Sequence, residues 1–155
     1  MRVCLLHDVV EDCDRYTLGD LGSRFDLTEE EQEALALLDR HRHDDNAYWE
    51  QIFRNPLALR AKVADRIANL VDLIAWIEND GRLLCGAHRQ AEKYLQEDGQ
   101  VALLFDQHFP AEPAPGEDHE VGSLQYLRDS MANLTEKLKN TMRRYENGRC
   151  RAHRW

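Results

Sequence analysis

Apolar residues recur every three or four positions along most of the chain, and no stretch alternates apolar and polar residues as a half-buried strand does. Two patterns of Thr followed three residues later by an acidic residue, at Thr17 and Thr28, are typical of capping boxes. In the first half, the spacing predicts helices over residues 2–13, from Thr17 through Arg24, from Thr28 through Leu38, and from Tyr48 to an end at Asn55-Pro56. A longer helix is predicted from Pro56 to about Glu78. Further helices are predicted over 83–97, over 100–109, and from Leu124 to near Gly148. Residues 41–46 are polar and are expected to form a loop. The sequence therefore predicts an all-α fold.

The long helix that begins at Pro56 has three predicted faces. Apolar residues at steps of four and three form a broad core stripe, Leu59, Val63, Ile67, Leu70, Ile74 and Ile77. Small residues form a second stripe, where a neighbouring helix could approach closely, Ala61, Ala64, Ala68 and Ala75. Polar residues occupy the gap between the stripes, Lys62, Asp65, Arg66, Asn69 and Asp72. Polar groups on a helix packed on two sides need partners, so this face is a candidate site, with a solvated face as the alternative.

A Pro-rich acidic segment divides the chain. We expect one domain over residues 1–109, a linker over 110–120, and an amphipathic helix with a basic tail over 121–155. The helix carries apolar residues at steps of four, three and four from Leu127 to Leu138, close to the seam of a coiled coil. With barely two heptads, docking on the preceding domain is favoured, and homo-oligomer formation through this helix is the alternative.

Net charge and composition restrict the kinds of partner that the protein can be expected to bind. The 155 residues include 20 Lys and Arg against 29 Asp and Glu, a net charge of −9. Duplex nucleic acid is disfavoured, because neutralisation of phosphates by basic side chains supplies most of that affinity. No run approaches the roughly 18 apolar residues of a membrane span, and the N-terminus does not resemble a signal peptide. The spacing of the four cysteines fits neither a zinc ribbon nor a disulfide framework. These features predict a cytoplasmic protein with reduced thiols and no membrane partner.

The densest group of ionisable residues is His-Asp-Val-Val-Glu-Asp at positions 7–12. On a helix, His7 and Glu11 are one turn apart, as are Asp8 and Asp12, so two rows of polar side chains lie on adjoining faces. Imidazole and carboxylate ligands together suit a divalent transition metal such as Mn²⁺. The alternative is an acidic helix end with a solvated histidine.

A second polar group, Lys-Val-Ala-Asp-Arg-Ile-Ala-Asn, lies at positions 62–69. Together with residues 7–12, and with Asn-Pro-Leu-Ala at 55–58, it resembles the HD-type hydrolase domain of RelA/SpoT alarmone enzymes, above all their small stand-alone members. The resemblance covers residues 2 to about 78. It implies an HD-domain helical bundle, to which the C-terminal amphipathic helix is an addition.

The resemblance also implies roles for individual residues. The metal ligands are His7, Asp8 and Asp65. The acidic pair that orients and deprotonates the attacking water is Glu11 and Asp12. The residues on the substrate side are Asn69, which contacts the nucleotide, with Lys62 and Arg66, which compensate charge or hold structure. The implied activity is metal-dependent hydrolysis of a small nucleotide with a divalent cofactor, Mn²⁺, and most closely removal of pyrophosphate from the 3′ position of guanosine 3′,5′-bis(diphosphate).

One part of the family pattern is missing. The family's first metal-binding His lies in a His-Pro-x-x-Val-Ala segment upstream of the His-Asp pair, whereas six residues precede His7 here and no His-Pro dipeptide occurs. His41 or His43 is an alternative ligand. Two other interpretations stay open: a degenerate HD domain that binds a nucleotide or a protein without turnover, and a fragment whose true start lies upstream of Met1.

Overall fold

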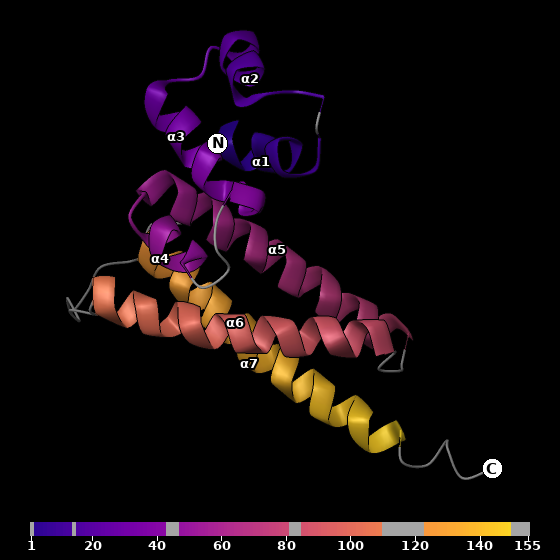
Figure 1. Ribbon diagram of the computed structural model, residues 1–155. Coiled ribbons are helices and arrows are strands. Elements are labelled where there is room, and N and C mark those ends of the chain that lie inside the picture. The colour runs from indigo at the N-terminus through magenta and orange to yellow at the C-terminus, as the bar shows by residue number, and fades with distance from the viewer. Residues whose placement is uncertain (1, 14, 43–46, 81–84, 110–122, 150–155) are drawn as a thin grey trace. The chain divides into compact units, whose positions relative to one another are not determined.

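The computed structural model describes residues 2–13, 15–42, 47–80, 85–109 and 123–149 (Figure 1). Across these residues the chain forms seven α-helices and one 3₁₀ turn and no strand, so the predicted all-α helical fold is confirmed. In chain order the elements are α1 Arg2–Asp12, α2 Leu18–Phe25, α3 Glu29–Leu38, η1 Arg40–Arg42, α4 Tyr48–Phe53, α5 Pro56–Asp80, α6 Cys85–His108 and α7 Leu124–Arg149. No helix in the described part of the chain is both long and apolar enough to cross a membrane.

The chain divides within α5 into two compact units, residues 1–65 and residues 66–155. In the first unit, α3 contacts α1, α2 and α4. The largest fully buried side chains of this unit are Leu35, Leu38, Tyr48, Ile52, Leu59 and Val63. In the second unit, α6 packs along α7. The corresponding side chains there are Leu70, Ile74, Ile77, Phe105 and Leu138.

Both predicted capping boxes form. The hydroxyl of Thr17 accepts a hydrogen bond from the backbone N–H of Asp20 at 3.2 Å, and the hydroxyl of Thr28 accepts one from the N–H of Glu31 at 3.2 Å. Each acidic side chain in turn accepts the N–H of its threonine. Glu31 also pairs with Arg2 at 3.0 Å, which ties the start of α1 to the start of α3. The local signals that predict helix starts therefore also contribute to packing in the first unit.

Of the two stripes predicted on α5, one is buried as expected and the other is not. The core stripe is confirmed, because Leu59, Val63, Leu70, Ile74 and Ile77 are buried and Ile67 is half-buried. The stripe of small residues is wrong as a packing face, since Ala61 is buried but Ala68 and Ala75 are exposed. A small side chain permits close approach of another helix but provides little apolar area to drive it.

One prediction about the C-terminal half changes in detail. Residues 83–97 and 100–109 were expected to form two helices, whereas α6 runs without a break through Gly99. One helical glycine costs about 1 kcal/mol relative to alanine, too little to interrupt a helix with good helix formers on both sides. The amphipathic helix spans Leu124–Arg149, and both of its ends agree with the predicted ones. The linker over 110–120 lies outside the described residues, and the domain boundaries stay predictions.

Candidate functional site

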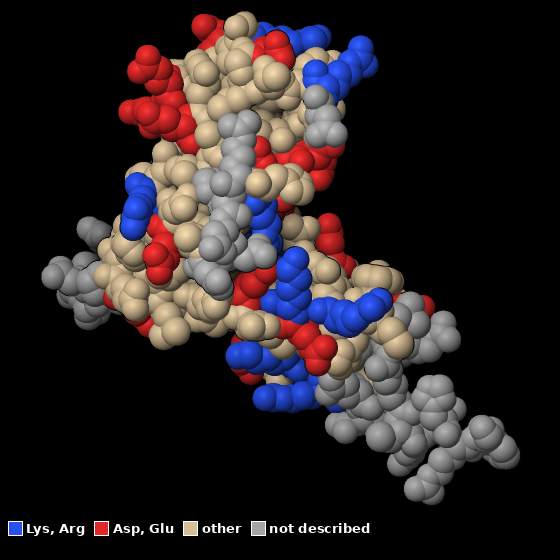
Figure 2. Space-filling view, viewed as in Figure 1, with Lys and Arg blue, Asp and Glu red and all other residues tan. Residues whose placement is uncertain are grey.

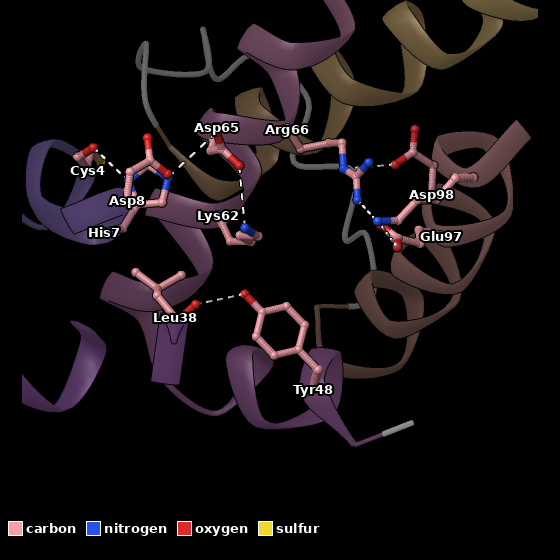
Figure 3. A network of polar contacts seen from close by, with 11 residues as sticks. Cys4, His7, Asp8, Leu38, Tyr48, Lys62, Asp65, Arg66, Glu97 and Asp98 are labelled. Atoms are coloured by element: carbon pink, nitrogen blue, oxygen red, sulfur yellow. Dashed lines mark hydrogen bonds and ion pairs between the residues drawn. The ribbon is translucent and has the colours of Figure 1, made fainter. Parts of the chain in front are cut away.

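Three of the predicted metal ligands, His7, Asp8 and Asp65, lie together in the first unit (Figure 3). The Nε2 atom of His7 is 2.9 Å from Asp8 Oδ1 and 3.6 Å from Asp65 Oδ1. The side chain of His7 is 8% exposed, that of Asp65 23% and that of Asp8 71%. A buried imidazole thus faces one fixed and one solvated carboxylate.

The other ring nitrogen fixes the tautomer of His7. Its Nδ1 atom lies 2.9 Å from the backbone carbonyl oxygen of Cys4. A carbonyl oxygen can only accept, so Nδ1 carries the hydrogen and donates it, and in the neutral ring Nε2 keeps its lone pair. Nε2 is buried and makes no hydrogen bond among the described residues. Metal-binding histidines commonly hold their second nitrogen in this way, with its N–H on a carbonyl or carboxylate.

The electrostatics of this group favour a cation at Nε2. The pKa of His7 is raised above its ordinary value of 6.5, chiefly because the Asp65 carboxylate can accept a hydrogen from the protonated ring, while burial acts in the opposite direction. Burial raises the pKa of Asp65, but His7 and Lys62 together outweigh it, so this pKa is lowered below 3.8. A lone pair facing two carboxylates would be repelled by them unless a proton or a metal ion lies between.

The donor set fits a divalent metal in its chemistry, although not in its present spacing. Among the described residues, no group of three or more His, Cys, Asp or Glu side chains is arranged to hold an ion as it stands. A site of one imidazole and two carboxylates needs a free imidazole nitrogen with carboxylates nearby. His7 Nε2 makes no hydrogen bond within the described part of the chain, and two carboxylates lie within 3.6 Å of it. The Asp8 side chain is 71% exposed, so little packing restricts its rotation. His7, Asp8 and Asp65 are therefore the residues that would hold the metal.

Lys62 brings positive charge to the edge of this group. Lys62 lies one turn before Asp65 on α5, and its Nζ atom is 3.5 Å from Asp65 Oδ2. The same ammonium lies 5.9 Å from the centroid of the Tyr48 ring, on α4. The Lys62 side chain is 12% exposed, so its interaction with Asp65 is partly shielded from solvent.

The predicted acidic pair lies at the end of α1. Glu11 is half-buried and Asp12 is exposed. Helix geometry places Glu11 one turn beyond His7 and Asp12 one turn beyond Asp8. Both carboxylates therefore belong to the helix that carries two of the candidate ligands.

The remaining sequence candidates lie in other surroundings. Asn69 belongs to the second unit and is half-buried on α5, one turn beyond Asp65. His41 is exposed in η1, and its backbone N–H donates to the carboxylate of Asp39 at 3.2 Å. His43 lies outside the described residues.

Arg66 is placed in the core of the second unit. Its side chain is 6% exposed, pairs with Glu97, and approaches Asp98 with Nε 3.6 Å from Oδ1 (Figure 3). Its guanidinium lies 4.1 Å from the centroid of the Tyr94 ring. Of the two roles named for Arg66 from the resemblance, these contacts are those of a residue that holds structure.

Sequence reasoning missed the partners of both cations. The sequence predicts Tyr48 only as the start of a helix, and it predicts Asp98 to lie between two helices. A signal for Asp98 was present: it falls on the buried face of α6, with Ala91 seven residues before it and Phe105 seven residues after it. An acidic residue in a core position requires a donor, and Arg66 with the hydroxyl of Thr135 at 2.9 Å provides it.

Charge is unevenly spread over the surface. In the face shown in Figure 2, Asp and Glu side chains gather over α3, whereas both signs are interspersed over α6 and α7. The first turn of α3 contributes Glu29, Glu30 and Glu31. Acidic side chains at a helix N-terminus are stabilised by the helix dipole, so this group has a structural role of its own.

Comparisons with protein families, with curated proteins and with solved structures return no match to this chain.

Proposed function

We propose that the protein is a metal-dependent phosphohydrolase of the HD type that acts on a nucleotide, most closely a guanosine 3′,5′-bis(diphosphate) 3′-pyrophosphohydrolase. One observation carries the proposal: a buried His7 Nε2 without a hydrogen bond among the described residues faces the carboxylates of Asp8 and Asp65, which come from two different helices. The sequence motifs at 7–12 and 62–69 lead to the same three residues.

The roles follow from the chemistry of each side chain. His7, Asp8 and Asp65 hold the metal through one nitrogen and two carboxylates. A bound divalent ion supplies Lewis-acid polarisation of a phosphoryl oxygen and lowers the pKa of water. Glu11 and Asp12 are the bases that accept the proton of the attacking water.

Lys62 supplies the charge that an anionic substrate needs beside these carboxylates. Its ammonium already lies against Asp65, so a phosphoryl group that approaches the metal ligands also approaches a cation. A fixed cation near a transferring phosphoryl group stabilises the charge of the transition state. The roles of Asn69 and Arg66 toward the nucleotide stay predictions from the resemblance.

The test is release of phosphate or pyrophosphate by the purified chain in the presence of Mn²⁺. The substrates are guanosine 3′,5′-bis(diphosphate) and a panel of other phosphorylated nucleotides. We expect Asp8→Asn to lower kcat/KM at least about 100-fold, because it removes a metal ligand. Glu33→Gln is the matched control, since it removes one exposed carboxylate of α3 that is none of the three candidate ligands. Absence of release from every nucleotide, or equal loss in the two variants, would refute the proposal.

The same experiment separates the alternative of a binding module. A degenerate HD domain would bind Mn²⁺ or the nucleotide without turnover. Paramagnetic resonance of Mn²⁺ and calorimetry with the nucleotide measure these affinities independently of hydrolysis. Binding that depends on Asp8, without release of phosphate or pyrophosphate, would replace the enzyme with the binding module.

A further inference from the structure

We infer that Tyr48 is a positioning residue, whose ring holds the Lys62 ammonium beside Asp65 for contact with an anionic phosphoryl group. The inference rests on the proposed function for its substrate and on the structure of the first unit for its geometry. It adds to the candidate site a residue that neither the motifs nor the metal chemistry points to.

The ring of Tyr48 is itself firmly held. Tyr48 is 1% exposed and is among the largest fully buried side chains. Its hydroxyl donates a hydrogen bond to the carbonyl oxygen of Leu38, the last residue of α3, at 3.3 Å. Trp49 meets the ring edge to face, with the centroids 5.9 Å apart. A ring fixed by α3 and by its own helix can act as a rigid surface for a mobile side chain.

Lys62 is the mobile side chain that this surface restrains. A lysine ammonium is a point charge at the end of a flexible four-carbon stem, and it loses rotamer entropy when it is fixed. Lys62 Nζ lies 5.9 Å from the Tyr48 centroid, within the range of a cation–π attraction, and 3.5 Å from Asp65 Oδ2. The ring and the carboxylate thus attract one ammonium, and together they restrict it more than either does alone.

The contact continues to the candidate metal ligands (Figure 3). Asp65 turns Oδ2 toward Lys62 and Oδ1 toward His7 Nε2. Three further carboxylates lie on α1, those of Asp8, Glu11 and Asp12. An ammonium that left the ring could pair with one of these carboxylates in place of Asp65. The ring therefore keeps the cation at the Asp65 edge of the site.

A second cation uses the same ring. The guanidinium carbon of Arg40, in η1, lies 5.4 Å from the Tyr48 centroid. Weakening the ring therefore affects two cations, and the experiment must separate them. Lys62→Met removes one of the two and leaves Arg40 in place.

The experiment weakens the ring without changing its size. Tyr48→Phe removes the hydroxyl, and a series of mono-, di- and trifluorinated phenylalanines at position 48 then withdraws electron density step by step from the ring face. Two quantities are measured for each variant: the rate at which an amine-selective acylating reagent modifies Lys62, read by mass spectrometry, and KM and kcat for the nucleotide that the chain hydrolyses. Lys93, which is 52% exposed, is the internal reference for the labelling rate. Unfolding midpoints establish that each variant is folded.

We expect labelling of Lys62 to accelerate about two- to fivefold across the series, with Lys93 unchanged, because a weakened ring releases the ammonium. KM is expected to rise by a similar factor with a smaller change in kcat. In a Lys62→Met background the same series should leave KM flat. The matched control is the same series at Tyr126, which is 40% exposed on α7 in the second unit and should change neither quantity.

Each of the other possible outcomes overturns one part of the inference about Tyr48 and Lys62. A flat labelling rate means that the ring does not hold Lys62, and a KM that stays constant while labelling rises means that the held ammonium does not serve the substrate. A rise in KM that persists in the Lys62→Met background assigns the effect to Arg40 or to structure. A folded chain without turnover overturns the proposed function and the substrate contact with it, whereas the first three results overturn the positioning role alone.

Discussion

Replacing Arg66 with Met should destabilise the second unit, because it leaves the buried carboxylate of Asp98 without its cationic partner. The Arg66 side chain is 6% exposed, and its guanidinium pairs with Glu97, lies 3.6 Å from Asp98 and covers the Tyr94 ring. Methionine keeps most of the packing volume of the buried stem and removes the charge. The largest consequence falls on Asp98, whose side chain is 2% exposed.

The cost at neutral pH follows from the burial of Asp98. Removing one partner of a buried ion pair typically costs 3–5 kcal/mol, because the other charge is left uncompensated. We expect about 3 kcal/mol at pH 7, the lower end of that range, since Asp98 retains the Thr135 hydroxyl at 2.9 Å. Loss of the contact with the Tyr94 ring accounts for about 1 kcal/mol of this figure.

The cost should shrink in acid, and the sign follows from the pKa of Asp98. Burial raises this pKa above its ordinary value of 3.8, and Arg66 acts in the opposite direction. A carboxyl with a raised pKa contributes stability that is fully present below the unfolded pKa and is lost as pH rises through the folded pKa. Without Arg66 the folded pKa rises further, so the loss between pH 4 and pH 7 becomes larger. At pH 4 we expect the variant to cost about 1 kcal/mol.

Urea unfolding followed by circular dichroism at pH 4, 5.5 and 7 measures these differences. The control is the same substitution in an Asp98→Asn background. There Glu97 still loses its partner but position 98 carries no charge, so the cost at pH 7 and its change with pH should both be smaller. A cost for Arg66→Met that is the same at pH 4 and pH 7 would refute the role of Asp98. A cost below about 0.5 kcal/mol at every pH would place Arg66 among ordinary surface positions.

Three further substitutions, one of them with a matched control, test the helices and the core by the same unfolding measurement. Thr28→Ala should lower the unfolding free energy by about 1 kcal/mol, since it removes the cap shared with Glu31; an unchanged midpoint would contradict this. Gly99→Ala should raise it by about 0.5–1 kcal/mol, because an added Cβ meets no atom within 4 Å, and a decrease would show a constraint at this position. Ile52→Ala, at a fully buried position, should cost about 3 kcal/mol, whereas Leu5→Ala, at a 71% exposed position, should cost less than about 0.5 kcal/mol; equal costs would disprove the assigned burial.

Helix starts were predictable because their causes are local. The cap at Thr28 needs a hydroxyl and a carboxylate three residues apart, and both can be identified in the sequence without knowledge of the fold. The predicted break before Gly99 failed for the opposite reason. Whether a helix continues through one glycine depends on what its two halves pack against, and Val101 and Phe105 continue the buried face of α6.

The candidate site was predictable in its parts, although not in its connections. His7, Asp8 and Lys62 could be selected because they belong to the motifs at 7–12 and 62–69. Tyr48 lies between the two motifs in sequence and belongs to neither, so the motifs do not point to it. Cation–π contacts have no fixed spacing along the chain, because any aromatic residue that the fold brings near a lysine can form one. The same holds for the acidic partners of Arg66, which lie 31 or more residues away.

The contacts of His7 separate what the first helix determines from what the fold must supply. Its Nδ1 donates to the carbonyl of Cys4, three residues earlier on α1, so helix geometry alone fixes the tautomer and leaves Nε2 with the lone pair. Asp8 is the next residue in the chain, so its carboxylate is also local. Asp65 alone comes from another helix, α5, and it is the main cause of the raised pKa of His7. The Asp65 carboxylate therefore depends on the tertiary fold to reach His7, and Lys62 pairs with that same carboxylate. A substitution that loosens α1 from α5 should lower the pKa of His7 while its hydrogen bond to Cys4 persists. In the metal-free chain, nuclear magnetic resonance of the ring would detect these two effects separately.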